Sequence, residues 1–110
     1  MRDSALLELL YATGMRVSEV VDLNVENVDL VDRQVECINR NKRRKIPIHQ
    51  RAARALRQYL EDGRLKLLRD DSEEALFLNH RGRRLTRQGL WLIIKKYVEE
   101  VGIDVSVTPH

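Results

Sequence analysis

The hydrophobic period changes twice along this chain of 110 residues, and that change restricts it to a mixed fold. Residues 5–12 are apolar on nearly every side, as in a helix buried in the core, and residues 17–23 and 90–101 repeat apolar side chains every three or four positions, as in helices that bury one face. In the middle, residues 34–38 and 45–48 form two short runs that are typical of strands, with a polar, basic tip at residues 39–44 between them. Pro47 restricts the second run to a sheet edge or a strand end. The sequence therefore predicts a mostly helical α+β domain with a small antiparallel β-hairpin.

Four helices are predicted around this hairpin. The first is expected to start at the N-cap Ser4 and to end at Gly14, and a short second helix begins near Arg16. A third follows Pro47 and closes at residues 62–63, before a charged and irregular stretch at 64–74. The last is predicted between the N-cap Thr86 and residue 102. One face of it is apolar and holds Leu90, Ile93, Ile94, Tyr97, Val98 and Val101.

Composition excludes several classes of protein. Hydrophobic residues make up 43% of the chain and charged residues 34%, which is too apolar for a disordered chain and too charged for a membrane span. The single cysteine, Cys37, cannot form an internal disulfide and has no Cys/His cluster at zinc spacing to join. We therefore expect a cytoplasmic protein that binds no metal.

The charge is unevenly distributed. The formal net charge is only +3, but basic residues crowd into two turn-like segments, 40–45 and 81–87. Clusters of this kind indicate a polyanion as partner.

Three segments carry a resemblance to a known family. Residues 5–23, ALLELLYATGMRVSEVVDL, resemble the first active-site box of the tyrosine recombinases, or phage integrases, and especially of the Xer type. Residues 85–91, LTRQGLW, resemble a later helix of the same subgroup. Residues 108–110, Thr-Pro-His, resemble the opening of the second box, which runs Pro-His-x-Leu-Arg-His.

The resemblance implies a partial catalytic domain spanning residues 1–110. The second-box arginine and the nucleophilic tyrosine of the family pattern do not occur in this sequence, and neither does the family's amino-terminal DNA-clamping domain. We therefore expect the chain to be truncated at both ends and to be unable to cleave DNA alone.

By the same resemblance, Arg16 is a catalytic arginine whose planar guanidinium binds two oxygens of the scissile phosphate. His110 matches the second-box histidine. Family members replace a DNA phosphodiester with a phosphotyrosine bond and use no metal and no cofactor. Glu19 is either a partner that holds Arg16 or a nearby base in place, or an ordinary helix carboxylate.

The family also places a lysine in the hairpin as general acid for the leaving 5′-oxygen. Alignment on the Asn-Lys pair at residues 41–42 puts Asn39 at that position, and asparagine cannot donate a proton as an acid. Lys42 is the alternative, and a solvated basic turn that touches phosphate only as a charge remains open beside it.

The remaining basic residues are predicted to contact DNA phosphates and to position the protein without reading sequence. These DNA-binding candidates are Arg40, Arg43, Arg44, Arg83, Arg84, Thr86, Arg87 and Gln88. His49 and His80 are expected at the surface. Packing in or near the core is expected for Tyr11, Tyr59, Tyr97, Trp91 and Cys37.

The function implied is site-specific DNA recombination and integration, with double-stranded DNA and other recombinase protomers as partners of the complete protein. Two alternatives stay open. One is a non-catalytic nucleic-acid-binding module that uses only the basic clusters, and the other is an interaction fragment that pairs with a full recombinase.

Overall fold

The computed structural model describes residues 1–100, and it confirms a mostly helical α+β arrangement with a small antiparallel sheet. Short turns η1 and η2 accompany the regular elements; η1 is a 3-10 turn and η2 is a π-helical turn. In chain order the elements are α1 (Arg2–Thr13), α2 (Val17–Val21), η1 (Val25–Asn27), β1 (Val28–Asp29), β2 (Gln34–Asn39), β3 (Lys42–Pro47), α3 (Gln50–Gln58), η2 (Tyr59–Gly63), α4 (Arg64–Leu67) and α5 (Arg87–Glu100).

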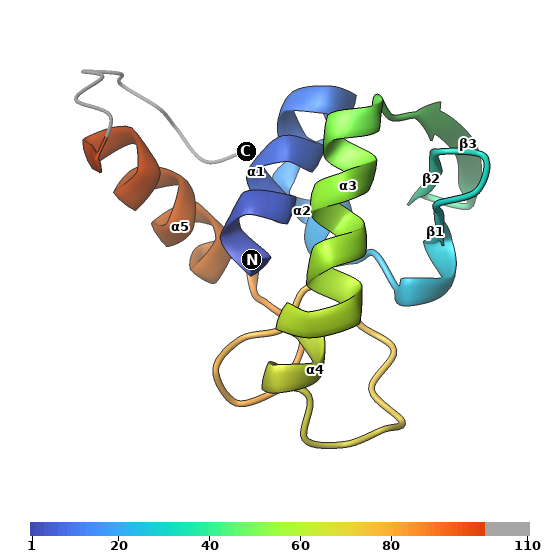
Figure 1. The fold of residues 1–110 in the computed structure, drawn as a ribbon. Coiled ribbons are helices and arrows are strands. Elements are labelled where there is room, and N and C mark those ends of the chain that lie inside the picture. Colours follow the sequence, from blue (N-terminus) through green and yellow to red (C-terminus); the bar gives the residue numbers. More distant parts are fainter. Residues whose placement is uncertain (101–110) are drawn as a thin grey trace.

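Helices α1 and α3 lie side by side in the middle of the molecule, with the sheet on one side and α5 on the other (Figure 1). The five-residue α2 contacts both β2 and α5, so it connects these two sides. The core is apolar and draws on nearly every element. Its largest fully buried side chains are Tyr59, Phe77, Leu6, Leu9, Leu56, Leu76, Leu78, Leu90, Val20, Val35 and Cys37.

The sheet has the order β1-β2-β3, and both neighbouring pairs are antiparallel. In the hairpin of β2 and β3, Val35 pairs with Ile46 and Asn39 pairs with Lys42. Only Arg40 and Asn41 connect the two strands, and both have positive φ, at 50° and 66°. Turns with two such residues match the twist of the strands that they join. The predicted six-residue tip at 39–44 is therefore wrong, because basic residues 42–44 already belong to β3.

The two ends of α1 differ in how well the sequence predicted them. Gly14 adopts the left-handed conformation expected of a helix-terminating glycine, with φ at 64°, and its N–H donates to the Leu10 carbonyl. The predicted N-cap Ser4 is wrong, since the helix already begins at Arg2. The Ala5 N–H donates to the Met1 carbonyl at 3.0 Å, so the first turn forms without a side-chain cap.

Gly63 does not end the third helix as predicted. The helical run continues from α3 through η2 into α4, and Gly63 itself has φ at −59°. A Cβ atom at this position would lie 2.8 Å from Met1 Cβ, so the glycine permits close approach to the start of α1. The irregular stretch predicted from residue 64 therefore begins only after Leu67.

Arg64 shows why this continuation is stable. Its side chain is buried, and its guanidinium donates to the Ala75 carbonyl at 2.8 and 3.0 Å and to the Glu73 carbonyl at 2.8 Å. A buried charge needs such partners. The carbonyl groups that accept from Arg64 belong to a segment about ten residues further along the chain. A helical pattern in the sequence does not reveal such partners.

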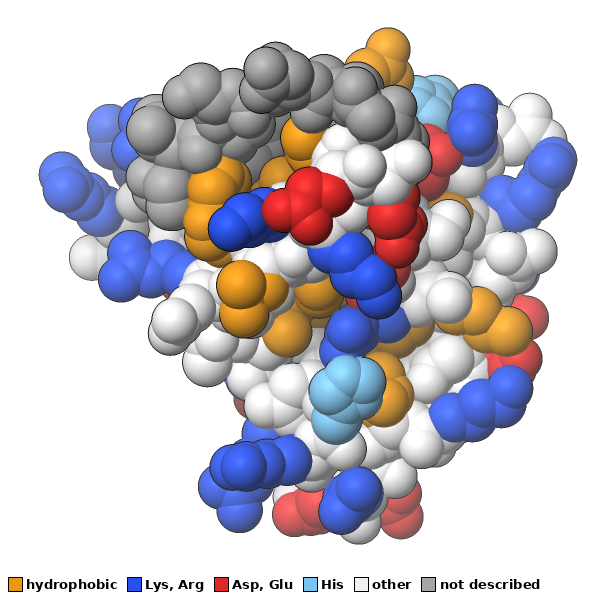
Figure 2. Space-filling view, turned by 90° about the vertical axis from the view of Figure 1, so that its left-hand side faces the viewer, with side chains coloured by type: hydrophobic (Ala, Val, Ile, Leu, Met, Phe, Trp, Pro, Cys, Tyr) orange, Lys and Arg blue, Asp and Glu red, His pale blue; other side chains and the backbone are white. Residues whose placement is uncertain are grey.

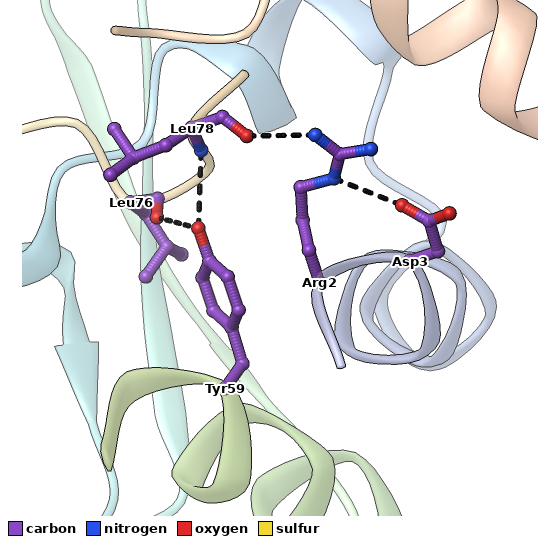
Figure 3. A network of polar contacts seen from close by, with 5 residues as sticks. All are labelled: Arg2, Asp3, Tyr59, Leu76 and Leu78. Atoms are coloured by element: carbon purple, nitrogen blue, oxygen red, sulfur yellow. Dashed lines mark hydrogen bonds and ion pairs between the residues drawn. The ribbon is translucent and has the colours of Figure 1, made fainter. Parts of the chain in front are cut away.

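Tyr59 ties the segment after α4 to the helices (Figure 3). Its hydroxyl donates to the Leu76 carbonyl at 2.7 Å and accepts from the Leu78 N–H at 3.1 Å. From the start of α1, Arg2 donates to the Leu78 carbonyl at 3.0 Å and pairs with Asp3. The bent segment around Leu76 and Leu78, which the sequence predicted to be extended, is therefore held from two sides.

Helix α5 confirms the predicted cap, because the Thr86 hydroxyl accepts from the Gly89 N–H at 2.9 Å. Leu90 is fully buried, and Ile93 and Ile94 pack against the core. Tyr97 is 46% exposed, and the predicted positions at 101 and 102 lie outside the described residues. No helix within residues 1–100 has the length and apolar character needed to cross a membrane.

Candidate DNA-phosphate site beside Arg16

The alternation of the hairpin strands sorts its side chains onto two faces. Val35 and Cys37 point to the core and are buried, so Asn39 in β2 and the paired positions Lys42 and Arg44 in β3 share their side of the sheet. Arg43 lies on the opposite side, where it pairs with Glu36 at 3.2 Å. The strand pattern therefore directs only part of the basic hairpin towards α2.

Arg16 directly precedes α2 and faces the same side of the hairpin. Its backbone is extended, with φ at −74° and ψ at 154°, and the residue is exposed. Together the two elements enclose an open depression of about 590 Å³. Its lining residues are Arg16, Ser18, Cys37, Asn39, Arg40, Lys42 and Arg44.

Four of these seven lining residues are cationic, and their charges are largely free for an outside partner. Across residues 1–100, no carboxylate lies within ion-pair distance of Arg16, Arg40, Lys42 or Arg44. Such a concave arrangement of unpaired cations favours an anion with several oxygens, such as phosphate.

Glu19 is the carboxylate behind this depression, and it joins the two elements that form it. One oxygen, Oε1, accepts from the Arg16 backbone N–H at 2.8 Å, and the other, Oε2, accepts from Asn39 Nδ2 at 3.1 Å and from Cys37 Sγ at 3.3 Å. The bond from the Arg16 N–H is the largest cause that lowers the pKa of Glu19, although burial opposes it. Glu19 therefore stays ionised and fixes the spacing between α2 and the hairpin.

Cys37 acts as a donor in this arrangement. Burial, and then the hydrogen bond to Glu19 and its charge, raise the pKa of the Cys37 thiol. The thiol therefore stays protonated, and its S–H group donates a hydrogen bond to the Glu19 carboxylate. The guanidinium of Arg44 lies 4.0 Å from the same sulfur. The prediction that Cys37 packs in the core is confirmed, but the thiol also supports the floor of the depression.

Asn39 and Lys42 are the polar pair of the hairpin that lines the depression with Arg16. Asn39, which the hairpin pattern aligns with the expected lysine, donates an amide N–H to Glu19 and has no ionisable proton. Lys42 is its cross-strand partner, is exposed and lines the depression with Arg16. The geometry thus leaves Lys42 as the lining residue with an ammonium group.

The second predicted set of DNA contacts does not line this depression. Arg83, Thr86, Arg87 and Gln88 are exposed near the start of α5. Arg84 does not fit its predicted role as a phosphate contact, because its guanidinium already donates hydrogen bonds to the Val21 and Leu23 carbonyls and to the side chain of Asn24. His110 lies outside the described residues.

The face seen from the α5 side mixes charges. Lys and Arg side chains are scattered over it, with acidic side chains and apolar patches between them (Figure 2). Arg81 and Arg83 are part of a separate polar groove that also contains the carboxylates of Asp70 and Glu73. This groove has both signs of charge, so it matches a polyanion less well than the depression beside Arg16.

Among the other predictions, His49 and His80 are at the surface as expected, and His49 also caps α3 by accepting from the Ala52 N–H. The expected packing of Tyr11 is wrong, since its side chain is 86% exposed. Sequence reasoning did not assign Ser18 or Cys37 to the site. The available signal was the two-residue alternation of the hairpin, which places Cys37 on the same side as Asn39.

Comparison with known proteins shows the family of this chain. All of residues 1–110 match the family described as phage integrase. The chain belongs to the phage integrase family. Two similar relatives in this family are tyrosine recombinase XerC of Roseiflexus castenholzii, 58% identical over 99% of this chain, and tyrosine recombinase XerD of Halalkalibacterium halodurans, 47% identical over 100% of this chain.

Solved structures show the same phage integrase fold. The XerA recombinase is 30% identical and superposes with a TM-score of 0.86 over 99% of this chain. The integrase of transposon Tn1549, solved in complex with a circular intermediate DNA, is 22% identical with a TM-score of 0.68 over 98% of this chain.

Coverage of these relatives is partial. The chain spans 35% of the XerC and 37% of the XerD relative, and 39% of the XerA chain. It therefore corresponds to about a third of each of these proteins.

Proposed function

We propose that this chain is part of the catalytic domain of a Xer-like tyrosine recombinase and that the depression beside Arg16 holds a phosphate of duplex DNA. The observation that carries the proposal is the convergence of Arg16 with the cationic side of the hairpin in one depression. Family membership supports it, and so does the DNA bound to the related transposon integrase.

The chemistry follows from the charge that strand exchange creates. Attack on a phosphodiester places negative charge on the non-bridging oxygens, and a guanidinium stabilises two of them through parallel N–H bonds. Arg16 is the residue assigned to this role. The Arg16 backbone N–H donates to Glu19, and this hydrogen bond fixes the backbone position from which the guanidinium extends.

Lys42 is the proposed acid for the leaving 5′-oxygen. A positioned general acid contributes roughly 10²- to 10⁴-fold in rate. Arg40 and Arg44 add positive charge around the same phosphate, and the exposed residues Arg83, Arg87 and Gln88 are proposed to contact the DNA backbone outside the depression. The 110 residues contain no tyrosine that follows a His-x-x-Arg box, so the proposed role of this segment is phosphate binding, charge stabilisation and protonation of the leaving oxygen.

Duplex binding across a salt series tests the proposal. Each phosphate neutralised makes the logarithm of the binding constant fall by about 0.9 per decade of salt. We expect Arg40→Gln and Lys42→Gln each to weaken binding at low salt and to reduce this slope by no more than that amount, because both cations surround one phosphate. Arg54→Gln is the matched control, because Arg54 is an exposed cation on α3 outside the depression, and it should leave the slope unchanged.

Two results would count against the proposal. Equal losses for Arg54→Gln and the depression variants would indicate a diffuse basic surface, as in a non-catalytic nucleic-acid-binding module. Binding that does not change with salt would favour the fragment that pairs with another recombinase.

A further inference from the structure

Arg84 makes a contact that neither DNA binding nor the catalytic chemistry explains. Its Nη1 donates to the Val21 carbonyl at 2.7 Å and to the Leu23 carbonyl at 3.0 Å, and its Nη2 donates to Asn24 Oδ1. The acceptors are 60 to 63 residues away in the sequence. The guanidinium therefore joins two distant parts of the chain through three acceptors.

These acceptors lie at the end of α2. Val21 is the last residue of that helix, so its carbonyl has no partner within the helix, and a cation there also complements the helix dipole. A helix of five residues is not stable by itself and takes its position from the contacts at its ends. Glu19 holds the end that carries Arg16, and Arg84 holds the other end.

The backbone around Arg84 is itself well anchored. Leu78 and Arg84 form a β-bridge, and the Leu85 N–H donates to the Phe77 carbonyl at 2.9 Å. Two residues after Arg84 comes Thr86, the cap of α5. Arg84 thus lies between α2 and the start of α5. Arg16 directly before α2, and Arg87 and Gln88 at the start of α5, are proposed to contact DNA.

We propose that Arg84 is a positioning residue that clamps α2 and thereby fixes Arg16 relative to the start of α5. This inference rests on the proposed function for its effect on DNA binding, but the clamp itself does not need DNA. It replaces the predicted phosphate contact of Arg84. Its neighbour Arg83 is exposed and keeps that predicted role, so it provides a matched control.

Amide hydrogen exchange tests the clamp without DNA. The reporters are the Asp22 and Leu23 N–H groups, which bond to the Ser18 and Val20 carbonyls within α2. With Arg84→Gln we expect these two amides to exchange roughly tenfold to a hundredfold faster, while amides inside α3 change much less. Arg83→Gln should leave both sets unchanged.

If Arg84→Gln destabilises the whole fold, its amides will exchange faster throughout the chain, and the local effect will be hidden. Asn24→Ala then serves as the milder variant, because it removes one acceptor and leaves both carbonyl bonds. It should give the same local pattern at a smaller magnitude. Unchanged exchange at Asp22 and Leu23 in both variants would overturn the clamp.

Duplex binding, measured well below the melting temperature, tests the effect on Arg16. A lysine keeps the charge but cannot reach several acceptors with a planar fork. We expect Arg84→Lys to weaken binding about as much as Arg84→Gln, by roughly tenfold, whereas Arg54→Lys, at an exposed cation outside the depression, stays within about twofold of the parent chain. Full rescue by Arg84→Lys would show an ordinary phosphate contact and overturn the proposal.

A double-mutant cycle separates positioning from a general loss of folded protein. If Arg84 acts through Arg16, then Arg84→Gln should add little to the loss already caused by Arg16→Ala, whereas Arg83→Gln should add its full effect. Additive losses for Arg84 would overturn the positioning role. If the parent chain shows no salt-dependent DNA binding, the proposed function fails, and the exchange result still decides whether the clamp exists.

Discussion

At the scale of single residues, Glu19 links the two elements that carry the basic side chains of the depression. The sequence predicted that Glu19 either holds Arg16 or a nearby base or serves as an ordinary helix carboxylate. The structure shows that it holds Arg16 through the backbone N–H, and that it also accepts from Cys37 and Asn39. The partner in the first contact, Arg16, is three residues from Glu19 in the sequence, so this contact follows from helix geometry. The others are 18 and 20 residues away and depend on how the hairpin docks, which no local pattern reveals.

This arrangement predicts how stability depends on pH. Because the folded state lowers the pKa of Glu19, the ionised carboxylate stabilises the fold above the ordinary pKa of a glutamate, about 4.3. That contribution is lost as the pH falls below this value through the folded pKa. Glu19→Gln should lower the free energy of unfolding at pH 7 by about 1–3 kcal/mol, because a buried amide meets donors where the carboxylate accepted.

Urea unfolding at pH 7 and at several lower pH values checks this prediction. The Glu19→Gln variant should also lose less stability on acidification than the parent chain does. Glu26→Gln, which alters an exposed carboxylate, should follow the parent curve. The account of Glu19 is refuted if the two variants behave alike.

At the scale of elements, helix period and turn chemistry predicted where most helices lie but not all of their ends. Gly14 and Thr86 act as predicted because their roles depend on adjacent residues. Gly63 was misread since its role is a close approach to Met1, far away in the sequence. The hairpin was predicted with too long a tip, because Arg40 and Asn41 adopt a left-handed turn that is usually made by asparagine and glycine.

Tyr59 provides a test of how the elements are joined. Its ring stacks on Phe77 with a centroid separation of 5.4 Å, and its hydroxyl bridges the Leu76 carbonyl and the Leu78 N–H. Tyr59→Phe keeps the ring but leaves both buried backbone groups without this partner. We expect the free energy of unfolding to fall by about 1–3 kcal/mol.

The control for this prediction is Tyr11→Phe, because the Tyr11 side chain is 86% exposed. Urea unfolding of both variants at neutral pH makes the comparison. A similar, small change in both would mean that the Tyr59 hydroxyl contributes nothing to the attachment of the segment around Leu76 and Leu78.

At the scale of the whole molecule, the net charge of +3 gives little indication of where DNA would bind. Folding places the basic side chains of the hairpin on two faces and pairs Arg43 with Glu36. It also engages the Arg84 guanidinium in a hydrogen bond to the Val21 carbonyl. What remains is a compact group of cations, Arg16, Arg40, Lys42 and Arg44, that have no ion-pair partner within residues 1–100. The sequence predicted Arg16 and the hairpin through their family resemblance, but the sorting of the neighbouring arginines required the tertiary structure.

The central claim is that Arg16 and the hairpin hold one DNA phosphate together, and the guanidinium NMR signals of the 110-residue chain test it most directly. During titration with duplex DNA, the Nε–H resonances of Arg16 and Arg40 should shift and saturate with one dissociation constant, since both would bind the same phosphate. The resonance of Arg54, outside the depression, should stay in place. A duplex that binds while the Arg16 resonance does not move would contradict the account.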